Sequence, residues 1–386
     1  MSETIEELPL SARAEGVLSA REAAEAIYEF ALKHGLVSAG GDAAPAELDD
    51  EDQDDAANAV RATRFEQHIV IEAFKRRPIK LITYDNKNRV VTIFTDKPLG
   101  VRIKKQLPLG IEGQVNIQYM ASGTPEVRGS DTSSFSAEPY YVVGGRYACG
   151  SSIFPANRMG AGTLGLLVKN DAGELFGLTN NRVTGACNHS EAGLPILAPA
   201  TGDVVAGRID PFTIGRHHTL RPIHDGHPGM ITIDDNLDVA TFSILNPNLV
   251  SSMQGHFYDT PGSVLPLDEG MRVEKVGRTT GRTTGAVIGA SVAPIAVLYD
   301  VREYGIKKHV FFPGERVFTV KADNDSFFST SGDSGALVVY TDDAGNKHSV
   351  GLVFAGNEKN KLSFIAPLHV ILEQLGVSVV SGHGVP

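Results

Sequence analysis

The first periodic segment of the chain is helical. Residues 18–35, LSAREAAEAIYEFALKHG, place apolar side chains at helical spacing. Ser19 can cap the helix, Glu22 completes a capping box with it, and Gly35 can end it. This pattern predicts one amphipathic helix.

A second helix is expected over residues 54–77, because Pro78 restricts the residue before it and stops a helix. The period then changes. Residues 79–96, IKLITYDNKNRVVTIFTD, contain two short β-type runs around a polar turn at 85–88. This pattern predicts a β-hairpin.

From about residue 136 to 377 the sequence consists of short β-type runs separated by Gly, Pro and Asp turns. This spacing predicts an all-β sandwich or barrel. Residues 367–377, PLHVILEQLGV, predict a closing helix that Gly376 ends. We therefore expect a helical region over 1–77, a leading hairpin and strands over 78–135, and a β domain over 136–386.

Charge is unevenly distributed in the first third of the chain. Residues 42–55 hold eight acidic and no basic residues, which is typical of a flexible, solvated linker. Residues 64–105 carry eleven Lys and Arg against four acidic residues. The linker could fold back on this strip, although two separately solvated faces are the simpler interpretation.

Composition narrows the function classes. The formal net charge of −11 argues against general nucleic-acid binding. The acidic N-terminal segment has no apolar signal-peptide core, and no run approaches the roughly 18 apolar residues of a membrane span. We expect a soluble, cytoplasmic protein with no membrane partner. In that compartment Cys149 and Cys187 are expected as reduced thiols and not as a disulfide.

One internal repeat stands out, GRTTGRTTG at residues 277–285. It lacks the spacing of a phosphate-binding loop. Thr and Gly in tandem instead favour a strand with a bulge or a tight bend.

The strongest chemical signal is STSGDSGALVVY at residues 329–340. Ser334 lies between Gly332 and Gly335 and precedes an apolar strand, a context that suits an exposed nucleophile. The backbone N–H groups of Gly332 and Ser334 could form an oxyanion hole. An ordinary turn before a strand is the alternative interpretation.

Two further segments support the nucleophile interpretation. Asp238 begins the apolar run of residues 236–245, NLDVATFSIL, where a carboxylate could orient an imidazole or simply start a strand. Residues 175–183, LFGLTNNRV, supply the third position, Arg182. Chain order is then 182, 238 and 334, the His–Asp–Ser order of chymotrypsin-type double barrels.

With these motifs, residues 161–375 resemble a trypsin-like serine peptidase family of bacteria and of the plant narrow-leaf proteins. The matching segments include AGTLGLLVKND, LTNNRV, LDVATF, KVGRTTGRTTGAV, SGDSGALVV and VGLVFAG. The preceding VTIFTDKPLG and LPLGIEGQVNIQY extend the resemblance to roughly 300 residues. It implies an all-β core, a chymotrypsin-like double β-barrel, with the helical and hairpin extension and the C-terminal helix outside it.

The resemblance also assigns roles. It implies Ser334 as nucleophile, Asp238 as orienting acid, and a histidine where this chain has Arg182. It further implies a protein or peptide substrate, no cofactor and no metal, with Phe328 and Gly356 contacting the substrate. Phe328, six residues before Ser334, would give an apolar pocket floor, or it is a core residue.

Arg182 changes the expected chemistry. A guanidinium has no acceptor and stays protonated at any physiological pH, so it cannot take the hydroxyl proton of Ser334. His189 lies roughly 10 Å further along if the segment is helical, which is too far to replace it. His217, His218, His224 and His227 are expected in a solvated loop, with metal binding as the weaker alternative.

Three functions remain open at this stage. In the first, the chain is a serine endopeptidase in inactive form, with Arg182 either natural or introduced. Alternatively it is a pseudoprotease that holds a peptide or protein in the former cleft, or, third, a homo-oligomeric structural subunit. For the first two we expect Arg182 and Asp238 within a few ångströms of the Ser334 hydroxyl, in an open cleft.

Overall fold

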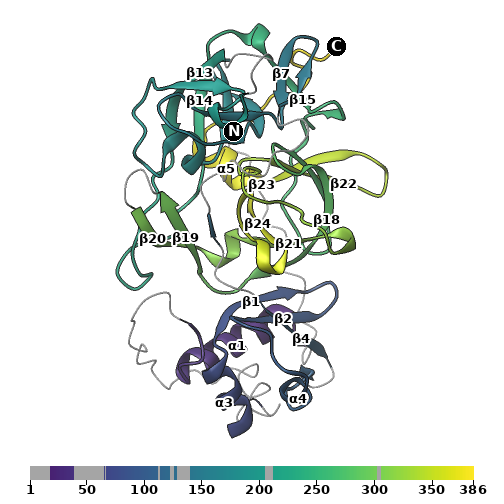
Figure 1. The fold of residues 1–386 in the computed structure, drawn as a ribbon. Coiled ribbons are helices and arrows are strands. Elements are labelled where there is room, and N and C mark those ends of the chain that lie inside the picture. Colours follow the sequence, from purple (N-terminus) through teal and green to yellow (C-terminus); the bar gives the residue numbers. More distant parts are fainter. Residues whose placement is uncertain are drawn as a thin grey trace, which may run out of the picture.

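The computed structural model describes residues 18–38, 65, 67–111, 114–121, 126–127, 140–204, 212–301 and 306–386. Figure 1 shows three bodies stacked along the molecule, with the N-terminal helices and strands at one end and two β bodies beyond them. The acidic linker 42–55 and the first half of the expected second helix lie outside the described residues. None of the described helices has the length and apolar character of a membrane span.

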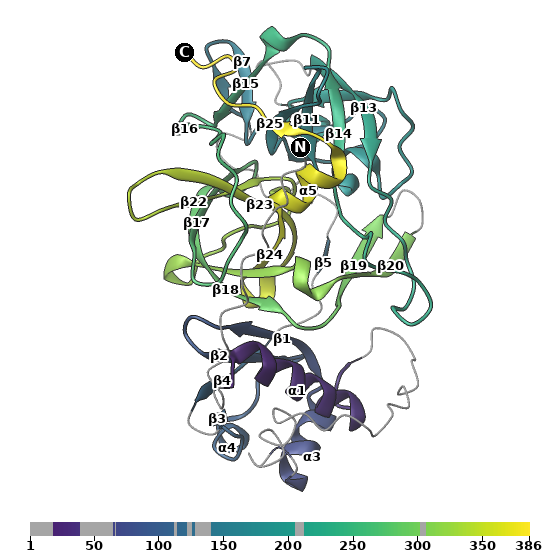
Figure 2. The same cartoon turned by 180° about the vertical axis from the view of Figure 1, so that it is seen from behind.

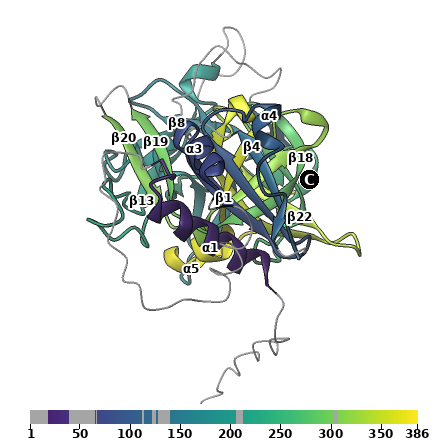
Figure 3. The same cartoon turned by 90° about the horizontal axis from the view of Figure 1, so that it is seen from below.

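The N-terminal body consists of the last strands of a larger sheet, covered by helices. Its helices are α1 (Ala20–Lys33), α3 (His68–Arg76) and the short α4 (Val101–Lys104), and its strands are β1 (Ile79–Asp85), β2 (Val90–Thr95), β3 (Gly110–Ile111) and β4 (Val115–Ala121). Helix α1 packs on β1 and β2, and Figure 3 shows it lying along β1. Helices and strands share one hydrophobic core.

The capping, hairpin and helix-stop signals in this body are confirmed. The expected helix over 54–77 is wrong in its extent, because α3 begins only at His68 and Gln67 before it is extended. Ser19 and Glu22 form the predicted capping box, and Gly35 has φ +63° just after the helix. The hairpin turns at Asp85, whose Oδ1 accepts the N–H of Asn88 at 2.8 Å. Helix α3 ends at Arg76, shortly before Pro78.

The first β barrel is a sheet whose two ends meet. Its strands are β8 (Ser152–Pro155), β9 (Gly162–Thr163), β10 (Leu166–Lys169), β11 (Leu175–Thr179), β12 (Pro195–Ala198), β13 (Phe212–Leu220) and β14 (Ala240–Ile244). They pair in the order β10-β11-β14-β13-β12-β8-β9. Only Leu164 and Gly165 separate β9 from β10, so one kinked stretch of chain pairs with both ends of the sheet.

The second barrel is a closed ring. Its strands are β17 (Arg272–Gly277), β18 (Gly281–Ser291), β21 (Phe318–Ala322), β22 (Leu337–Thr341), β23 (Lys347–Asn357) and β24 (Leu362–Pro367). They pair in the cycle β17-β18-β21-β24-β23-β22 and back to β17, always antiparallel. The predicted double β-barrel is therefore confirmed by strand pairing. The repeat at 277–285 forms the tight bend between β17 and β18, with Gly281 at φ +65°.

Smaller elements complete the body. A hairpin of β19 (Ile295–Val301) and β20 (Ile306–Phe312) projects from the second barrel, and the two-residue strand β5 (Glu126–Val127) lies against β19. A separate sheet joins β6 (Val142–Val143), β7 (Arg146–Cys149), β15 (Val250–Gln254) and β16 (Tyr258–Asp259). Cys149 and Cys187 are not in a disulfide, as predicted.

The C-terminal segment returns to the first barrel. The predicted helix α5 (Leu368–Leu375) ends at Gly376, and β25 (Ser378–Val379) then pairs with β10. Further on, the Ser252 N–H donates to the His383 carbonyl at 2.9 Å. Figure 2 shows this tail running from α5 towards β7 and β15.

The N-terminal body meets the second barrel at an acidic contact. Lys87 pairs with the Asp268 carboxylate and donates to the Glu269 carbonyl at 3.1 Å. Glu269 itself is buried. Burial, followed by the hydrogen bond with Asp268, raises the pKa of Glu269 to about 7.

The raised pKa of Glu269 predicts that the contribution of this one side chain to the free energy of unfolding falls as the pH rises. An unfolded glutamate has a pKa of about 4.3, so between about pH 4.3 and 7 the folded state binds the proton more tightly. Glu269→Gln should remove that loss and stabilise the protein at pH 8 by about 1–3 kcal/mol, with little gain near pH 5. Urea unfolding at both pH values measures it. Glu72→Gln, on a partly buried glutamate of α3, is the control. Equal pH dependence in the two variants would contradict the assignment.

Candidate active site

Position 182 is fixed by the turn that follows β11. Residues Asn181–Gly185 form a π-helical turn. Asn180, just before the turn, and Asn181, its first residue, hold it in place through their side chains. The Asn180 side-chain amide donates to the Asp238 carbonyl at 2.7 Å, and that of Asn181 donates to the Arg221 carbonyl at 2.8 Å. The two asparagines of the TNN motif therefore position residue 182 beside Asp238.

Asp238 presents both carboxylate oxygens to residue 182. Its Oδ1 accepts the Arg182 N–H at 3.0 Å, and its Oδ2 lies 3.6 Å from Arg182 Nε. The Tyr299 hydroxyl donates to the same Oδ2 at 3.0 Å. Burial raises the pKa of Asp238, and the Arg182 charge opposes that rise. Arg182 and Asp238 are therefore in contact, while their predicted position beside the Ser334 hydroxyl stays a prediction.

Tyr299 was not anticipated from the sequence, and it supports the carboxylate from β19. Tyr299→Phe removes a hydrogen bond to a buried charged acceptor and should cost about 1–3 kcal/mol of unfolding free energy. Chemical denaturation measures the loss. Tyr340→Phe, on a partly buried tyrosine of β22, is the control. Equal losses in the two variants would show that the Asp238 contact contributes nothing.

Ser334 lies at the seam between the barrels. Its carbonyl accepts the Thr163 N–H of β9 at 2.9 Å. A Cβ on Gly335, which has φ +91°, would lie only 2.2 Å from Thr179 Oγ1 at the end of β11. Glycine is therefore required at 335, and the close packing brings the Ser334 loop against the strand that leads to Arg182.

The loop leaves backbone donors available. Among the described residues, neither the Gly332 N–H nor the Ser334 N–H donates a hydrogen bond, while the Gly332 carbonyl accepts from Thr163 Oγ1 at 2.8 Å. Gly332 has φ +96°, a conformation that favours glycine. These two N–H groups are the ones predicted for an oxyanion.

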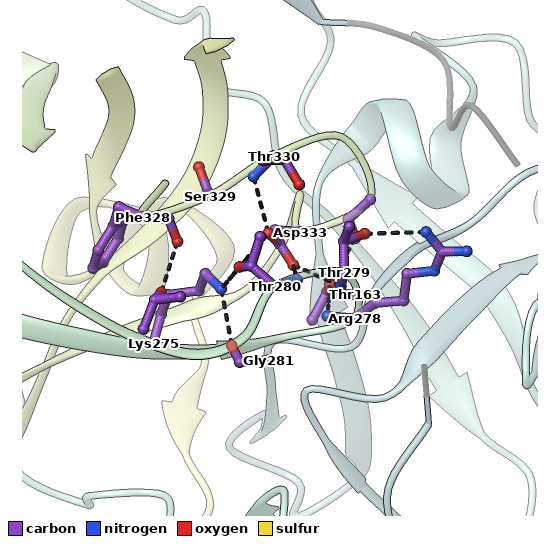
Figure 4. A network of polar contacts seen from close by, with 12 residues as sticks. Thr163, Lys275, Arg278, Thr279, Thr280, Gly281, Phe328, Ser329, Thr330 and Asp333 are labelled. Atoms are coloured by element: carbon purple, nitrogen blue, oxygen red, sulfur yellow. Dashed lines mark hydrogen bonds and ion pairs between the residues drawn. The ribbon is translucent and has the colours of Figure 1, made fainter. Parts of the chain in front are cut away.

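Asp333 anchors the loop from below (Figure 4). Its carboxylate lies 3.6 Å from Lys275 Nζ, and both side chains are fully buried. It also accepts the N–H groups of Thr279, Thr280 and Thr330 at 2.8, 3.1 and 2.9 Å. Burial lowers the pKa of Lys275, and Asp333 opposes that shift. The sequence signal for Lys275 is a lysine within the strand VEKVG, and this signal does not identify Asp333 as its partner.

A second buried ion pair joins the two barrels. Arg278, at the bend after β17, contacts Asp203 of the first barrel, with Nε to Oδ2 at 2.8 Å. The Arg278 N–H also donates to Thr163 Oγ1 at 3.1 Å. Figure 4 shows Arg278 and Thr163 beside the Asp333 network. This pair fixes the seam on which the geometry of the site depends.

The expected exposed nucleophile is wrong for this conformation, whereas the open cleft stays a prediction. Ser334 is 6% exposed and the Arg182 side chain is 11% exposed, while the Asp238 side chain is fully buried. The loop packs against β9 and β11, and the large guanidinium occupies the space in front of the carboxylate.

Three other expectations need correction or refinement. The Phe328 side chain is fully buried in the core of the second barrel, so it presents no surface to a substrate. His217 and His218 lie on strand β13, not in a loop, and His217 is buried. Gly356 lies near the end of β23, opposite Glu126. No group of three or more His, Cys, Asp and Glu residues in the described part of the chain could hold a metal.

No family model and no curated protein matches this chain. Solved structures with a similar fold include Thermobifida fusca protease A, at 17% identity and TM-score 0.40, covering 61% of this chain and 100% of that one. Nocardiopsis protease is similar at 18% identity and TM-score 0.37, covering 60% and 97%. Cellulomonas bogoriensis chymotrypsin is similar at 17% identity and TM-score 0.38, covering 61% and 98%. The TM-scores are low, and the double barrel is established by the closed strand pairings described above.

Proposed function

We propose that this chain is a serine endopeptidase by fold, in which Arg182 has replaced the general base and left the site inactive. The observation that supports it most is the contact of Asp238 with residue 182. Its Oδ1 accepts the main-chain N–H of that residue and its Oδ2 faces the side chain. An orienting carboxylate needs this geometry to hold an imidazole.

The remaining parts also suit acyl transfer. Ser334 supplies a hydroxyl, and the N–H groups of Gly332 and Ser334 supply donors for a developing oxyanion. Asp333 is held by Lys275, which fixes the loop before any substrate arrives. The one missing component is an acceptor for the Ser334 proton, because a guanidinium only donates.

A fluorophosphonate probe tests the proposal at the level of the nucleophile. It should label Ser334 rapidly in Arg182→His and at most slowly in the unaltered protein, with labelling of Arg182→His/Ser334→Ala absent. Intact-mass spectrometry and peptide mapping give the readout. Slow, equal labelling of the first two proteins would refute the peptidase assignment.

The second candidate is a binding module that holds a peptide without cleaving it. The nearly buried Arg182–Asp238 pair favours it, because the arginine side chain lies against the carboxylate that would otherwise orient a histidine. Binding of an unfolded protein to the unaltered chain, combined with an inactive Arg182→His variant, would favour this function over the first.

A further inference from the structure

Strand β5 is an unusual member of the 13-stranded sheet that contains the second barrel and the β19–β20 hairpin. It has only two residues, and it comes from the segment that joins the N-terminal body to the first barrel. Glu126 and Val127 pair in parallel with Leu298 and Tyr299 of β19, and Glu126 also pairs antiparallel with Gly356 of β23. A short piece of chain is thus inserted between two strands that do not pair with each other.

The two flanking strands form a slot one strand wide. On its other side β19 pairs with β20, and β23 pairs with β24. The edge of β19 that faces β5 pairs with no other strand among the described residues. The corresponding edge of β23 pairs with β22 as far as Leu352 and meets β5 further along, at Gly356. Neighbouring strands lie about 4.8 Å apart, so the slot is roughly 9.6 Å across and takes a single extended backbone. Exposed strand edges of this kind bind peptides by β-strand addition.

Both walls of the slot lead directly to the candidate active site. Tyr299, which pairs with Val127, donates its hydroxyl to Asp238. Val353, three residues before Gly356 on β23, accepts the N–H of Gly335, the residue after Ser334. Three extended residues span roughly 10 Å, so a chain in the slot lies within a few residues of the nucleophile.

We propose that the slot between β19 and β23 is the site for an extended peptide, and that residues 126–127 of the chain itself occupy it and block that peptide. The peptide's role as a substrate rests on the proposed function, whereas the self-occupied slot does not. The segment contributes backbone hydrogen bonds that any extended peptide can supply, so the slot accepts many sequences. A two-residue strand makes few such bonds, so it is displaced when its pairing is weakened.

The test is binding of a labelled peptide with the sequence of residues 122–131, SGTPEVRGSD, to the protein with Arg182 unaltered. In Glu126→Pro/Val127→Pro the internal strand loses both of its N–H donors, which face opposite neighbours. This variant should bind the peptide at least tenfold more tightly than the unaltered protein. Glu126→Ala/Val127→Ala keeps both donors and is the matched control, expected to remain blocked.

Two further controls secure the outcome. The same peptide with prolines at the two central positions should not bind. If the double-proline variant does not fold, as judged by circular dichroism, each single proline removes the donor to only one neighbour and is used instead. Equal affinity of the unaltered and proline proteins, or binding of the proline peptide, overturns the proposal.

The proposal of a self-occupied slot and the proposal of a peptidase can be refuted separately. Tighter peptide binding together with an inactive Arg182→His variant supports the slot and refutes the peptidase. An active Arg182→His protein whose rate does not rise with the two prolines refutes the self-block and leaves the peptidase intact.

Discussion

Arg182→His should give a protein that cleaves unfolded polypeptides, with kcat/KM at least on the order of 10³ above that of the unaltered chain, because loss of the base in a comparable triad costs roughly 10⁶ in turnover. The expectation follows from protonation. Ser334 needs an acceptor near neutral pH, and an imidazole with a reference pKa of about 6.5 is one. Asp238 is already placed to orient it, through contacts to the main chain and side chain of residue 182. The readout is hydrolysis of a quenched, fluorescently labelled unfolded protein.

The pH profile and two controls identify the cause. Because the neutral imidazole is the active form, the rate should rise from about pH 5 to pH 8. Arg182→Gln removes the positive charge without adding a base and should stay inactive. Ser334→Ala in the histidine background should abolish the gain. Equal activity of the His and Gln variants would show that charge removal, and not a base, is responsible.

Lys275→Met should destabilise the protein by about 3–5 kcal/mol, because it leaves the Asp333 carboxylate buried without its cation. Asp333 keeps its hydrogen bonds from Thr279, Thr280 and Thr330, which favours the lower end of that range. Differential scanning calorimetry should show a decrease in Tm of roughly 4–6 °C for a chain of this size. The loop that carries Ser334 is the part expected to loosen first.

Lys347→Met is the matched control for Lys275→Met. Lys347 also pairs with a buried carboxylate, that of Glu274, but its side chain is 29% exposed and Glu274 keeps Arg282 as a partner. It should cost at most about 1 kcal/mol. Lys275→Met/Asp333→Asn should recover part of the loss, since the uncompensated charge is gone. Equal losses for the two single lysine variants would contradict a special role for Lys275.

Local features were predictable from the sequence because their causes are local. The capping box at Ser19, the turn at Asp85 and the stop at Gly376 each depend on residues within four positions. The barrel strands follow from the alternation of apolar residues and the spacing of turns. The contact between residues 182 and 238 came from the resemblance, which carries long-range information that periodicity does not.

The features that the sequence did not predict all depend on contacts between residues far apart in the chain. Nothing near Lys275 shows that a carboxylate 58 positions later covers its ammonium group. The same holds for Arg278 and Asp203, separated by 75 positions. Burial of Ser334 is set by packing against β9 and β11, and β5 is too short to show a period. Each depends on tertiary packing, which local patterns do not encode.

The return of the C-terminal segment to the first barrel bears on how the chain folds during synthesis. Strand β10 pairs with β25, and Ser378 follows its partner Lys169 by 209 positions. At about 5–20 residues per second, this edge of the first barrel waits on the order of 10–40 s for its partner to be made. During that interval the nascent chain carries an unpaired strand edge, the kind of surface that chaperones protect. The order of translation therefore makes the edge of β10 the last part of the first barrel to be covered, after the strands of both barrels have been made.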